Sequence, residues 1–580
     1  MKYELLKPIN SECSLIEQIF HNRNIPIENI DGFLNPSIGC ILNPYLLDNI
    51  EAAAELLLKH LKRNSKVFIQ VDSDCDGYTS SSILLNWLYA FDKNLYQNIE
   101  FRIHTGKQHG LLEETIQYLR DNAFNLVIIP DAGSNQTDIH KLLLEINVDC
   151  IILDHHESDG LTSSAIIVNP QLDSYPNKNL SGAGVVYKFC KVLDDKQGVN
   201  YADKFLDLVA LGMIADMMDT TELETRRLIL TGLNNINNGF FKALIEKQAY
   251  SMKNEVTPTT IGFYIAPLIN AVVRAGTEEE KSLIFSALLD SNAGIKIKST
   301  KRGAKENDTE YIIENGCRLI SNIRSRQNKL RDASVEAIEA KIESDGLNLN
   351  KIIVIINERL EDKNLSGLIA NKLLGKYRKP IFILKETEEG LLQGSARGYE
   401  KSELQDFKSF VNGSQLCEYA EGHANAFGVG IKKDNLADFI IFSNEALKDI
   451  SFDNRYLVDY IYDINYLRES DVEQIFSLRN LWGRKFEEPL FCIKNIKLKA
   501  EDIILLSANK NPTLKISYKN FSFLKFGFSQ DEYQKLLPRG EGRAHIEVVG
   551  RFQLNEWNGN YYPQILIEDY NKLEEIKYYF

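Results

Sequence analysis

The sequence has no long hydrophobic run. No stretch of about 18 consecutive apolar residues occurs in its 580 residues, so it predicts no membrane-spanning helix. The opening segment MKYELLKPINSECSLIEQIF contains no apolar core of the kind that a secretory signal needs. We therefore predict an intracellular protein, in the cytoplasm of a bacterium or, for a phage protein, of its host.

Cysteine is scarce, and its spacing is uninformative for metal binding. The eight cysteines are scattered along the chain, and no two of them form a C-x-x-C pair. This spacing argues against a zinc site and against a disulfide framework, and it suits a reducing compartment.

An excess of positive charge is also missing. The formal net charge is −14, so composition does not mark a nucleic-acid-binding protein. It does not exclude one, because binding depends on local basic patches while the acidic remainder can face solvent. No internal repeat or low-complexity segment occurs, and the length suggests three or four domains.

The stretch VDSDCDGYTSS (71–81) carries three alternating carboxylates, Asp72, Asp74 and Asp76, directly after an apolar run. Alternate residues of an extended chain project to one face, and crowded carboxylates repel unless they are protonated or bridged by a cation. A solvated turn is the plain alternative. A calcium loop of the D-x-D-x-D-G type is excluded, because its twelfth position would hold Ile83 instead of a carboxylate.

The same pattern recurs twice further along the chain. The apolar run 125–130 ends at Asp131, and the run 148–153 ends at the sequence DHH. Helical patterns accompany these short buried runs, as at 48–62 and 80–91. Such alternation predicts a parallel, doubly wound sheet whose acidic turns all lie on one edge.

An apolar helical run, 204–216, ends on a further carboxylate. Carboxylates with one or two imidazoles and no thiolate favour Mn²⁺ or Mg²⁺ over zinc. Four or more carboxylates are too many for one ion and suit a pair about 3.5–4 Å apart, the arrangement used for in-line displacement at phosphorus. The expected cluster consists of Asp72, Asp74, Asp76, Asp131, His155, His156 and Asp216.

Residues 296–331 are unusually basic, with ten Lys or Arg against four Asp or Glu. The helical pattern continues to about 343, which predicts a long connecting helix over 296–345 with a basic face. A merely solvated surface is the alternative.

A second α/β unit follows this helix. Strand 351–357, helix 365–377 and strand 380–384 precede two glycine-bearing segments, GSARGYE and EGHANAFGVG, which we expect to be loops.

From about residue 484 the pattern changes to short strands. Asn558-Gly559 lies between the last two of them, a strong hairpin signal. Five or so strands at this end of the chain predict a small barrel of the oligonucleotide-binding (OB) type.

Several of these segments carry a family resemblance. VDSDCDGYTSS, IIPDAGS, LDHHES and ALGMIADMMD, in that order, resemble the first four motifs of the DHH phosphoesterase family. SGAGVVYKF, IAPLINAVVRAG, LSGLIANKLLGKYRKPIFIL, GSARG and EGHANAFGVG resemble the DHH-associated domain (DHHA1) and the linker region of RecJ-like members. The tail, from WGRKFEEPLF to YYPQILIEDY, resembles the OB domain of RecJ-like exonucleases. The resemblance runs from about residue 46 to the end.

The resemblance implies an α/β fold in which a long helix joins a parallel-sheet DHH domain to a second α/β domain, followed by a C-terminal β-barrel. The expected parts are an N-terminal segment at 1–45, the DHH domain at 46–295, the connecting helix at 296–345, the DHHA1 substrate-binding domain at 346–450 and the OB domain at 451–580.

It also implies roles for the acidic cluster. Two ions, Mn²⁺ or Mg²⁺, would be bridged by Asp131. His156 would contact the scissile phosphate or protonate the leaving oxygen, Asp154 would orient the site, and Asp72 would lie beside or within the ligand set. The implied metal ligands are Asp74, Asp76, Asp131, His155 and Asp216.

Substrate contacts are implied in both α/β domains. Ser395, Arg397 and His423 would hold the phosphate of a DNA end, and Gly422 would let the backbone approach it. The contacts implied within the DHH domain are Asn270 and Arg274.

The chain departs from the family in the segment RIHTGKQHGLL. The family's arginine position holds His104, and its Gly-Tyr-Gly appears as QHG. His104 is the candidate phosphate contact here, with Lys107 and Arg102 as alternatives.

The leading prediction is a metal-dependent 5′→3′ exonuclease that hydrolyses single-stranded DNA in recombination, repair or replication. One alternative is a DHH phosphodiesterase for short RNA or cyclic dinucleotides, which usually needs only the two α/β domains. Another is a non-catalytic replication scaffold, which would have lost metal ligands. We expect a monomer that binds single-stranded DNA, with a single-strand-binding protein or a helicase as partner, and no membrane association.

Overall fold

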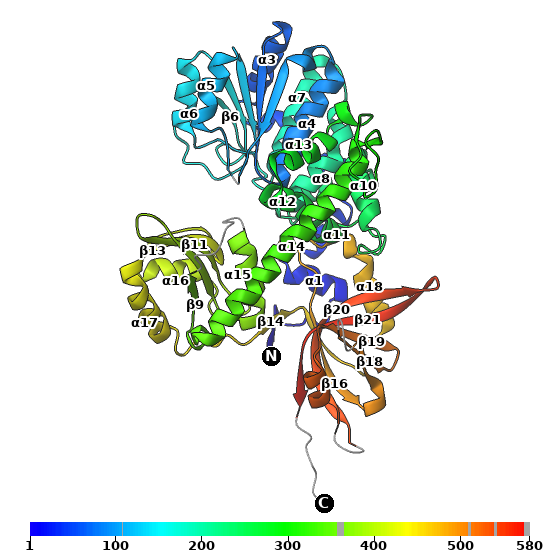
Figure 1. Cartoon of the computed structure of the whole chain (residues 1–580). Coiled ribbons are helices and arrows are strands. Elements are labelled where there is room, and N and C mark those ends of the chain that lie inside the picture. Colours follow the sequence, from blue (N-terminus) through cyan, green and yellow to red (C-terminus); the bar gives the residue numbers. More distant parts are fainter. Residues whose placement is uncertain (107, 357–364, 508–511, 539–541, 574–580) are drawn as a thin grey trace, which may run out of the picture. The chain divides into compact units, whose positions relative to one another are not determined.

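The computed structural model describes residues 1–580 apart from 107, 357–364, 508–511, 539–541 and 574–580 (Figure 1). The chain divides into two compact units. The parallel-sheet unit comprises Asp31–Gln327 and Asn480–Glu487, and the mixed-sheet unit comprises Met1–Ile30, Asn328–Arg479 and Glu488–Phe580.

The parallel-sheet unit is built on five parallel strands in the order β3-β2-β4-β5-β6. Every residue of β2 and β4 is buried, as expected for strands covered on both faces. The predicted parallel sheet is therefore confirmed. Its strands are β2 (Val67–Val71), β3 (Ile99–Ile103), β4 (Leu126–Pro130), β5 (Asp149–Leu153) and β6 (Ile166–Val168).

Alternate residues of β2 enter two different cores. Val67, Ile69 and Val71 pack with α3, α4 and α7, whereas Phe68 packs on the other face with α5 and α6. Figure 1 shows these two helical layers on opposite sides of the sheet. The helices are α3 (Ile50–Lys62), α4 (Cys75–Phe91), α5 (Glu113–Asp121), α6 (Thr137–Glu145) and α7 (Gly182–Gln197).

A helical subdomain completes this unit. Its first helix, α8, is apolar around its whole circumference and is buried from Asp207 to Met213, as a central core helix should be. The helices are α8 (Leu206–Ala215), α9 (Leu223–Asn234), α10 (Gly239–Gln248), α11 (Pro258–Tyr264), α12 (Ala266–Ala275) and α13 (Glu278–Ala287).

The predicted connecting helix over 296–345 starts later than expected. Strands β7 (Lys296–Lys298) and β8 (Thr309–Tyr311) form an antiparallel hairpin, with Gly303 at a φ of 84° between them. Helix α14 (Ile312–Ser344) follows, and the two units divide within it. The glycine-bearing turn explains the difference, because it interrupts the basic run before the helix begins.

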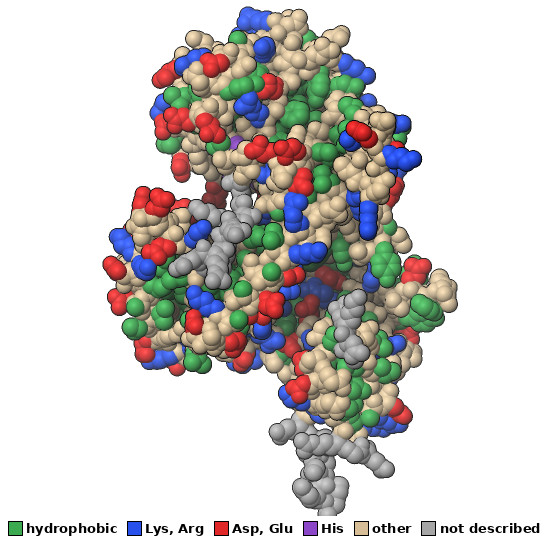
Figure 2. Space-filling model, in the orientation of Figure 1, with side chains coloured by type: hydrophobic (Ala, Val, Ile, Leu, Met, Phe, Trp, Pro, Cys, Tyr) green, Lys and Arg blue, Asp and Glu red, His purple; other side chains and the backbone are tan. Residues whose placement is uncertain are grey.

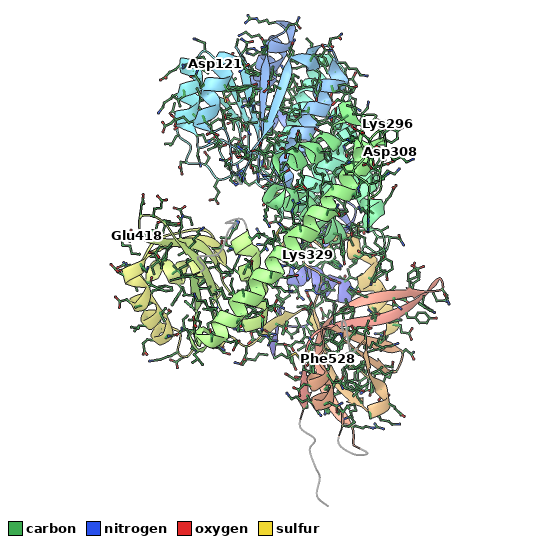
Figure 3. The ribbon with its side chains drawn as sticks, viewed as in Figure 1. Asp121, Lys296, Asp308, Lys329, Glu418 and Phe528 are labelled. Atoms are coloured by element: carbon green, nitrogen blue, oxygen red, sulfur yellow. The ribbon has the colours of Figure 1, made fainter. Side chains whose placement is uncertain are left out.

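Much of the basic charge in this region is neutralised locally. Arg318 pairs with the buried Glu310 at 2.5 Å, and Arg326 pairs with Glu280 at 2.7 Å. Figure 3 shows Lys329 further along α14. Residues 296–331 therefore do not form a continuous basic face.

The mixed-sheet unit contains a five-stranded sheet in the order β12-β13-β11-β10-β9. Only β9 and β10 pair in parallel. The segments GSARGYE and EGHANAFGVG are predicted as loops, but they supply most of β11 and β13 and the end of β12. The strands are β9 (Ile353–Ile356), β10 (Ile381–Glu386), β11 (Leu391–Arg397), β12 (Cys417–His423) and β13 (Ala426–Lys432). Residue 357 of the predicted strand 351–357 lies outside the described residues.

Helices cover the two faces of this sheet unequally. On one face, α16 (Phe407–Gly413) and α17 (Leu436–Ala446) pack against the inward side chains of β9, β10, β11 and β13. On the other, α14 and α15 (Ser366–Tyr377) bury the apolar side chains of β9 and β10, and the start of α15 also lies beside β11. That second face of β13 and β12 is therefore left without a covering helix among the described residues.

The C-terminal sheet has seven strands in the order β15-β16-β20-β21-β19-β18-β17. The predicted hairpin at Asn558-Gly559 is present, and both residues have positive φ, as a type I′ turn requires. The strands are β15 (Tyr460–Asp463), β16 (Phe491–Leu498), β17 (Ile503–Leu506), β18 (Thr513–Tyr518), β19 (Phe521–Phe526), β20 (Ala544–Trp557) and β21 (Asn560–Leu573), with helices α18 (Glu469–Ser477) and α19 (Gln530–Leu536).

The first residues of the chain belong to this same unit. Strand β1 (Lys2–Leu5) pairs in parallel with β14 (Arg455–Val458). Helix α1 (Leu15–Asn22) adds a buried contact, because Asn22 and the following Arg23 both donate hydrogen bonds to Asp459. The segment predicted at 1–45 is thus divided, with Asp31 onward in the parallel-sheet unit.

Among the described residues, none of the helices is both long and apolar enough to cross a bilayer.

Candidate metal centre and substrate trough

The carboxyl ends of the parallel strands bring the predicted acidic residues together. Asp72 and Asp74 follow β2, Asp131 follows β4, and the DHH sequence follows β5, while Asp216 caps the end of α8. Their ligand atoms form three groups, each with all atoms within 4.8 Å of one another. The groups are Asp131, His155 and His156; Asp76, His155 and Asp216; and Asp72, Asp74 and Asp131.

His155 lies at the centre of this cluster. Its Nε2 is 3.2 Å from Asp131 Oδ1, 3.4 Å from Asp216 Oδ2 and 3.8 Å from Asp76 Oδ2. Asp131 and His155 each belong to two of the three groups. All five residues predicted as metal ligands therefore converge on one edge of the sheet.

The cluster has the character of a cation site. Neither buried carboxylate oxygen of Asp131, nor Nε2 of His155, has a hydrogen-bond partner among the described residues. Burial and the charges of Asp76 and Asp74 raise the pKa of Asp131 well above its usual value and that of Asp216 to about 8. Divalent cations would satisfy these oxygens and remove the repulsion, so the donor set fits Mn²⁺ or Mg²⁺.

Asp76 is anchored by the start of α7. Its carboxylate accepts hydrogen bonds from the backbone N–H of Gly182 at 2.6 Å and of Ala183 at 3.2 Å, and from Ser181 Oγ at 2.9 Å. A helix N-terminus stabilises negative charge. The sequence SGAG therefore positions a predicted ligand that lies in the first turn of α4.

Three glycines allow the carboxylates to crowd this closely. A Cβ added to Gly182 would overlap Asp131, one added to Gly212 would overlap Asp76, and one added to Gly77 would lie 2.7 Å from Asp72 Cβ. The sequence alone assigned no role to these glycines. The signal available was their position beside each acidic motif, in CDG, SGAG and ALGM.

Asp154 orients the site without joining any of the three groups. Its carboxylate accepts hydrogen bonds from His156 Nδ1 at 2.8 Å, from the backbone N–H of His155 at 2.7 Å and from Ser134 N–H at 3.0 Å. Burial alone would raise the pKa of Asp154, but these bonds outweigh it and lower that pKa. The hydrogen bond to Asp154 raises the pKa of His156 to about 9, so this half-exposed imidazole carries a proton near neutral pH.

Asp72 holds the segment that departs from the family. His109 Nδ1 lies 2.7 Å from Asp72 Oδ2, and Gly110 N–H donates to Asp72 Oδ1 at 3.0 Å. His109 is half-exposed and lines the cavity beside the acidic cluster. His104, the predicted phosphate contact, is buried and does not line that cavity. His109, which the sequence did not single out, is therefore the histidine of this segment that lies at the cavity, because the loop turns His109 toward Asp72.

A cavity of about 190 Å³ opens beside the cluster. Asn270 and Arg274, both on α12 and both predicted as substrate contacts, line it. Asn270 Oδ1 accepts a hydrogen bond from the backbone N–H of Cys75 at 3.2 Å, so it supports the start of α4. Burial lowers the pKa of Arg274, and the nearby Asp74 partly offsets this. Its lining residues are Ser73, Asp74, Cys75, Asp76, His109, Ala215, Asp216, Asn270, Val273 and Arg274.

The second set of predicted substrate residues lies on the uncovered sheet face of the mixed-sheet unit. In register across three strands, Arg397 pairs with Ala426 and Ala426 with His423. The next row on this face is Ser395, Gly428 and Glu421. Directly paired residues share a face, so β11 and β12 form walls around a floor of Ala426 and Gly428. We call this the substrate trough.

The start of α15 borders the trough. The hydroxyl groups of Ser366 and Ser395 form a hydrogen bond of 2.8 Å. A Cβ added to Gly367 would lie 2.5 Å from Arg397 Nη2. Gly422 does not share this face, since it pairs with Phe427, whose side chain enters the core. Its φ of 131° shows that glycine is required there by the backbone.

Two family models match parts of this chain. The family described as DHH family, N-terminal domain, matches residues 66–213, and the RecJ OB domain matches residues 458–569. The chain is 37% identical over 572 residues to the putative SPbeta prophage-derived single-strand DNA-specific exonuclease YorK of Bacillus subtilis, covering 98% of this chain and 97% of that protein.

The chain belongs to the RecJ branch of the DHH family. It is also 26% identical over 549 residues to Bacillus subtilis RecJ, covering 93% of this chain and 65% of that protein. The crystal structure of Thermus thermophilus RecJ in complex with Mn²⁺ matches with a TM-score of 0.72 and 21% identity, over 99% of this chain and 80% of that one. The RecJ fold predicted from sequence is therefore confirmed, including its C-terminal OB domain.

Proposed function

We propose that this protein is a metal-dependent exonuclease that hydrolyses single-stranded DNA from the 5′ end. The observation that carries the proposal is the convergence of Asp74, Asp76, Asp131, His155 and Asp216 on one sheet edge, with unsatisfied oxygens on Asp131. Membership of the RecJ branch supports the substrate, because relatives in that branch are named single-strand DNA-specific exonucleases.

Mn²⁺ or Mg²⁺ would be held by those five residues, among which Asp131 and His155 each belong to two of the three ligand groups, and would supply Lewis-acid activation of water and of the phosphate. The chain's own groups do the rest. Arg274 lies in the cavity wall near Asp74, where a guanidinium can orient a phosphodiester.

His156 is the proposed proton donor to the leaving oxygen. Its proton is held by the hydrogen bond from Nδ1 to Asp154, which also fixes the orientation of the ring and leaves Nε2 as the donor to the substrate. His109 on Asp72 adds a second imidazole at the cavity.

The 5′ polarity is proposed from the substrate trough. Arg397 and Ser395 on one wall, and His423 on the other, present donors to a terminal phosphate over a floor that has no side chain larger than a methyl group. A guanidinium can donate two parallel hydrogen bonds to phosphate oxygens. Such a trough suits one phosphorylated strand end.

Cleavage of end-labelled oligonucleotides tests the proposal. Single- and double-stranded DNA, each labelled at the 5′ or the 3′ end, is incubated with Mn²⁺, Mg²⁺ or EDTA. We expect metal-dependent release of nucleotides from the 5′ end of single strands. Cleavage of only cyclic dinucleotides or short RNA, offered in parallel, would instead identify a small-substrate phosphodiesterase, and no cleavage of any substrate would favour a scaffold.

Two further properties, the location of the protein and its assembly state, are also proposed. A cytoplasmic location is proposed because all eight cysteines are free thiols in the structure. A monomeric state, and a single-strand-binding protein or helicase as partner, are proposed from the RecJ relationship alone. Sedimentation of the purified protein and co-precipitation with a single-strand-binding protein test them.

A further inference from the structure

The hairpin β20–β21 extends beyond the strands that flank it (Figure 1). Strand β16 pairs with β20 only as far as Gly550, and β19 pairs with β21 only from Gln564 to Leu566. Between these points the two strands pair with each other up to Trp557 and Asn560. The end of the hairpin is therefore a two-stranded ribbon without a further strand partner among the described residues.

The two faces of this ribbon differ in chemistry. Phe552, Pro563 and Ile565 share one face and are buried against the unit. The side chains on the opposite face are two aromatic rings and four carboxamides. They are Gln553, Asn555, Trp557, Asn560, Tyr562 and Gln564.

The aromatic rings on that face are open to solvent. Trp557 is 66% exposed and Tyr562 is 49% exposed. Figure 2 shows hydrophobic side chains gathered on this projecting part of the unit. Trp557 and Tyr562 lie in adjacent rows of this face, and contiguous exposed apolar surface, unlike a single exposed ring, marks interaction sites. From the Gln553–Gln564 pair outward, this face carries no aliphatic side chain and no charge. The next pair inward on the face is Arg551 and Leu566, and Arg551 forms ion pairs with Glu488 and Glu568. The one charged residue of the ribbon tip, Glu556, lies on the other face beside Tyr561.

We infer that this face of the ribbon binds bases of single-stranded DNA, with Trp557 and Tyr562 as stacking platforms. This rests on the proposed single-stranded DNA substrate. Exposed aromatic rings accept the π-face of any base, and carboxamides donate to and accept from base edges. The ribbon joins the last two strands of an OB domain, a loop position that serves oligonucleotide binding in that fold.

Because the outer part of the aromatic face carries no charge, its contribution to DNA binding should differ from that of a phosphate-binding surface. Bases would contact the ribbon while phosphates stay in solvent, so the contact should depend on the presence of bases and hardly on salt. A phosphate-binding surface would show the opposite behaviour. These two dependences separate the site from the trough around Arg397.

The test measures binding of the full-length protein in EDTA, so that no strand is cleaved. Trp557→Ala combined with Tyr562→Ala should weaken binding of an oligo-dT strand by about tenfold or more, since stacking is worth ~1–3 kcal/mol per base. The slope of log K against log salt should not change. An oligonucleotide of equal length whose central positions are abasic should bind the wild type more weakly than oligo-dT, and the double variant should lose most of that preference.

Tyr561→Ala is the matched control, because Tyr561 is 60% exposed but on the other face of the ribbon. It should bind oligo-dT like the wild type. Trp557→Phe keeps a ring and should bind within about threefold of the wild type. It should nevertheless abolish most of the fluorescence quenching on DNA binding, since Trp87 and Trp482 are buried.

Equal affinity of the double variant and the wild type for oligo-dT would overturn the inference. So would an equal loss with Tyr561→Ala, or a self-association of the wild type that the double variant loses while its DNA affinity is unchanged. The proposed function fails separately: wild-type protein that binds and quenches but cleaves no strand with metal contradicts the nuclease, whereas normal cleavage with no base preference contradicts only the ribbon.

Discussion

The metal centre and the substrate trough differ in how far their side chains are buried. At the metal centre, Asp72, Asp76, Asp131 and Asp154 are each 1% exposed, and backbone amides, an imidazole and three glycines fix their positions. In the trough, the walls are partly exposed and the floor consists of Ala426 and Gly428. A cation site gains from burial because desolvated carboxylates repel without a cation, whereas a strand end needs an open surface. The comparison predicts that changes at the centre act on metal and chemistry, while changes in the trough act on binding.

The largest expected effect is at Asp131. Asp131→Asn keeps the shape of the side chain but removes the charge that both ions would share, so cleavage should fall by about 1,000-fold or more. Thermal unfolding with and without Mn²⁺ provides the second readout. The wild type should be stabilised by Mn²⁺ through mass action, and the variant should show little of that stabilisation. Near-normal cleavage by the folded variant would contradict the two-metal assignment.

A smaller effect is expected at Gly182, which touches no substrate. Gly182→Ala would force a methyl group against Asp131, so the apparent metal affinity should fall by about 10- to 100-fold, the range for groups that position ligands. Metal titration of cleavage measures it, and excess Mn²⁺ should restore much of the rate. Gly375→Ala on α15, where an added Cβ meets nothing within 4 Å, is the matched control and should behave like the wild type.

The trough should respond to the chemistry of the strand end. Arg397→Ala should weaken binding of 5′-phosphorylated strands by about tenfold, the loss of a charge-assisted hydrogen-bond pair, and should change 5′-hydroxyl strands little. Competition binding in EDTA measures both. Arg120→Ala, an exposed arginine on α5, serves as the control. Equal losses for the two kinds of end would rule out the trough as the phosphate site.

The smallest expected effect is on the pH dependence of the thermal stability of the metal-free protein. Burial with Asp76 and Asp74 raises the pKa of Asp216 to about 8, and the bond to Asp154 raises that of His156 to about 9. Both values lie above those of the unfolded chain, so their stabilising contributions are present at low pH and are lost as pH rises through about 8 and about 9.

We therefore expect the Tm of EDTA-treated protein to fall by a few degrees, about 2–4 °C per kcal/mol lost, between pH 7 and pH 9. Mn²⁺ should reduce the fall, and Asp216→Asn should flatten part of it. A Tm that rises between pH 7 and pH 9 would show that Asp216 and His156 do not determine the pH dependence of stability in this interval.

Much of the metal centre could be predicted, because the carboxyl ends of parallel strands all lie at one edge of the sheet. Each acidic motif follows a short apolar run, and the structure places all of them together. The roles of Gly77, Gly182 and Gly212 could not be predicted, because they depend on distances between segments far apart in the chain. The position of His109 at the cavity could not be predicted for a related reason: the direction of the loop depends on its hydrogen bonds to Asp72.

The trough was harder to foresee. The alternating glycines of GSARG and AFGVG have low strand propensity and suggest loops, but the strands form because their other face carries Phe427, Val429 and Ile431 into the core. Tertiary burial overrides the local preference. The hairpin around Gly303 was not predicted either, because the basic pattern on both sides of it is compatible with one continuous helix.

The pairing of β1 with β14 has a consequence for synthesis on the ribosome. The two strands are separated by about 450 residues, and all of Asp31–Gln327 lies between them in the chain. At roughly 5–20 residues per second, β14 is made about 20–90 s after β1. The parallel-sheet unit has most of its sequence available long before that. The first thirty residues must therefore wait, unpaired, while the segment behind them folds, and β1 joins its sheet only near the end of translation.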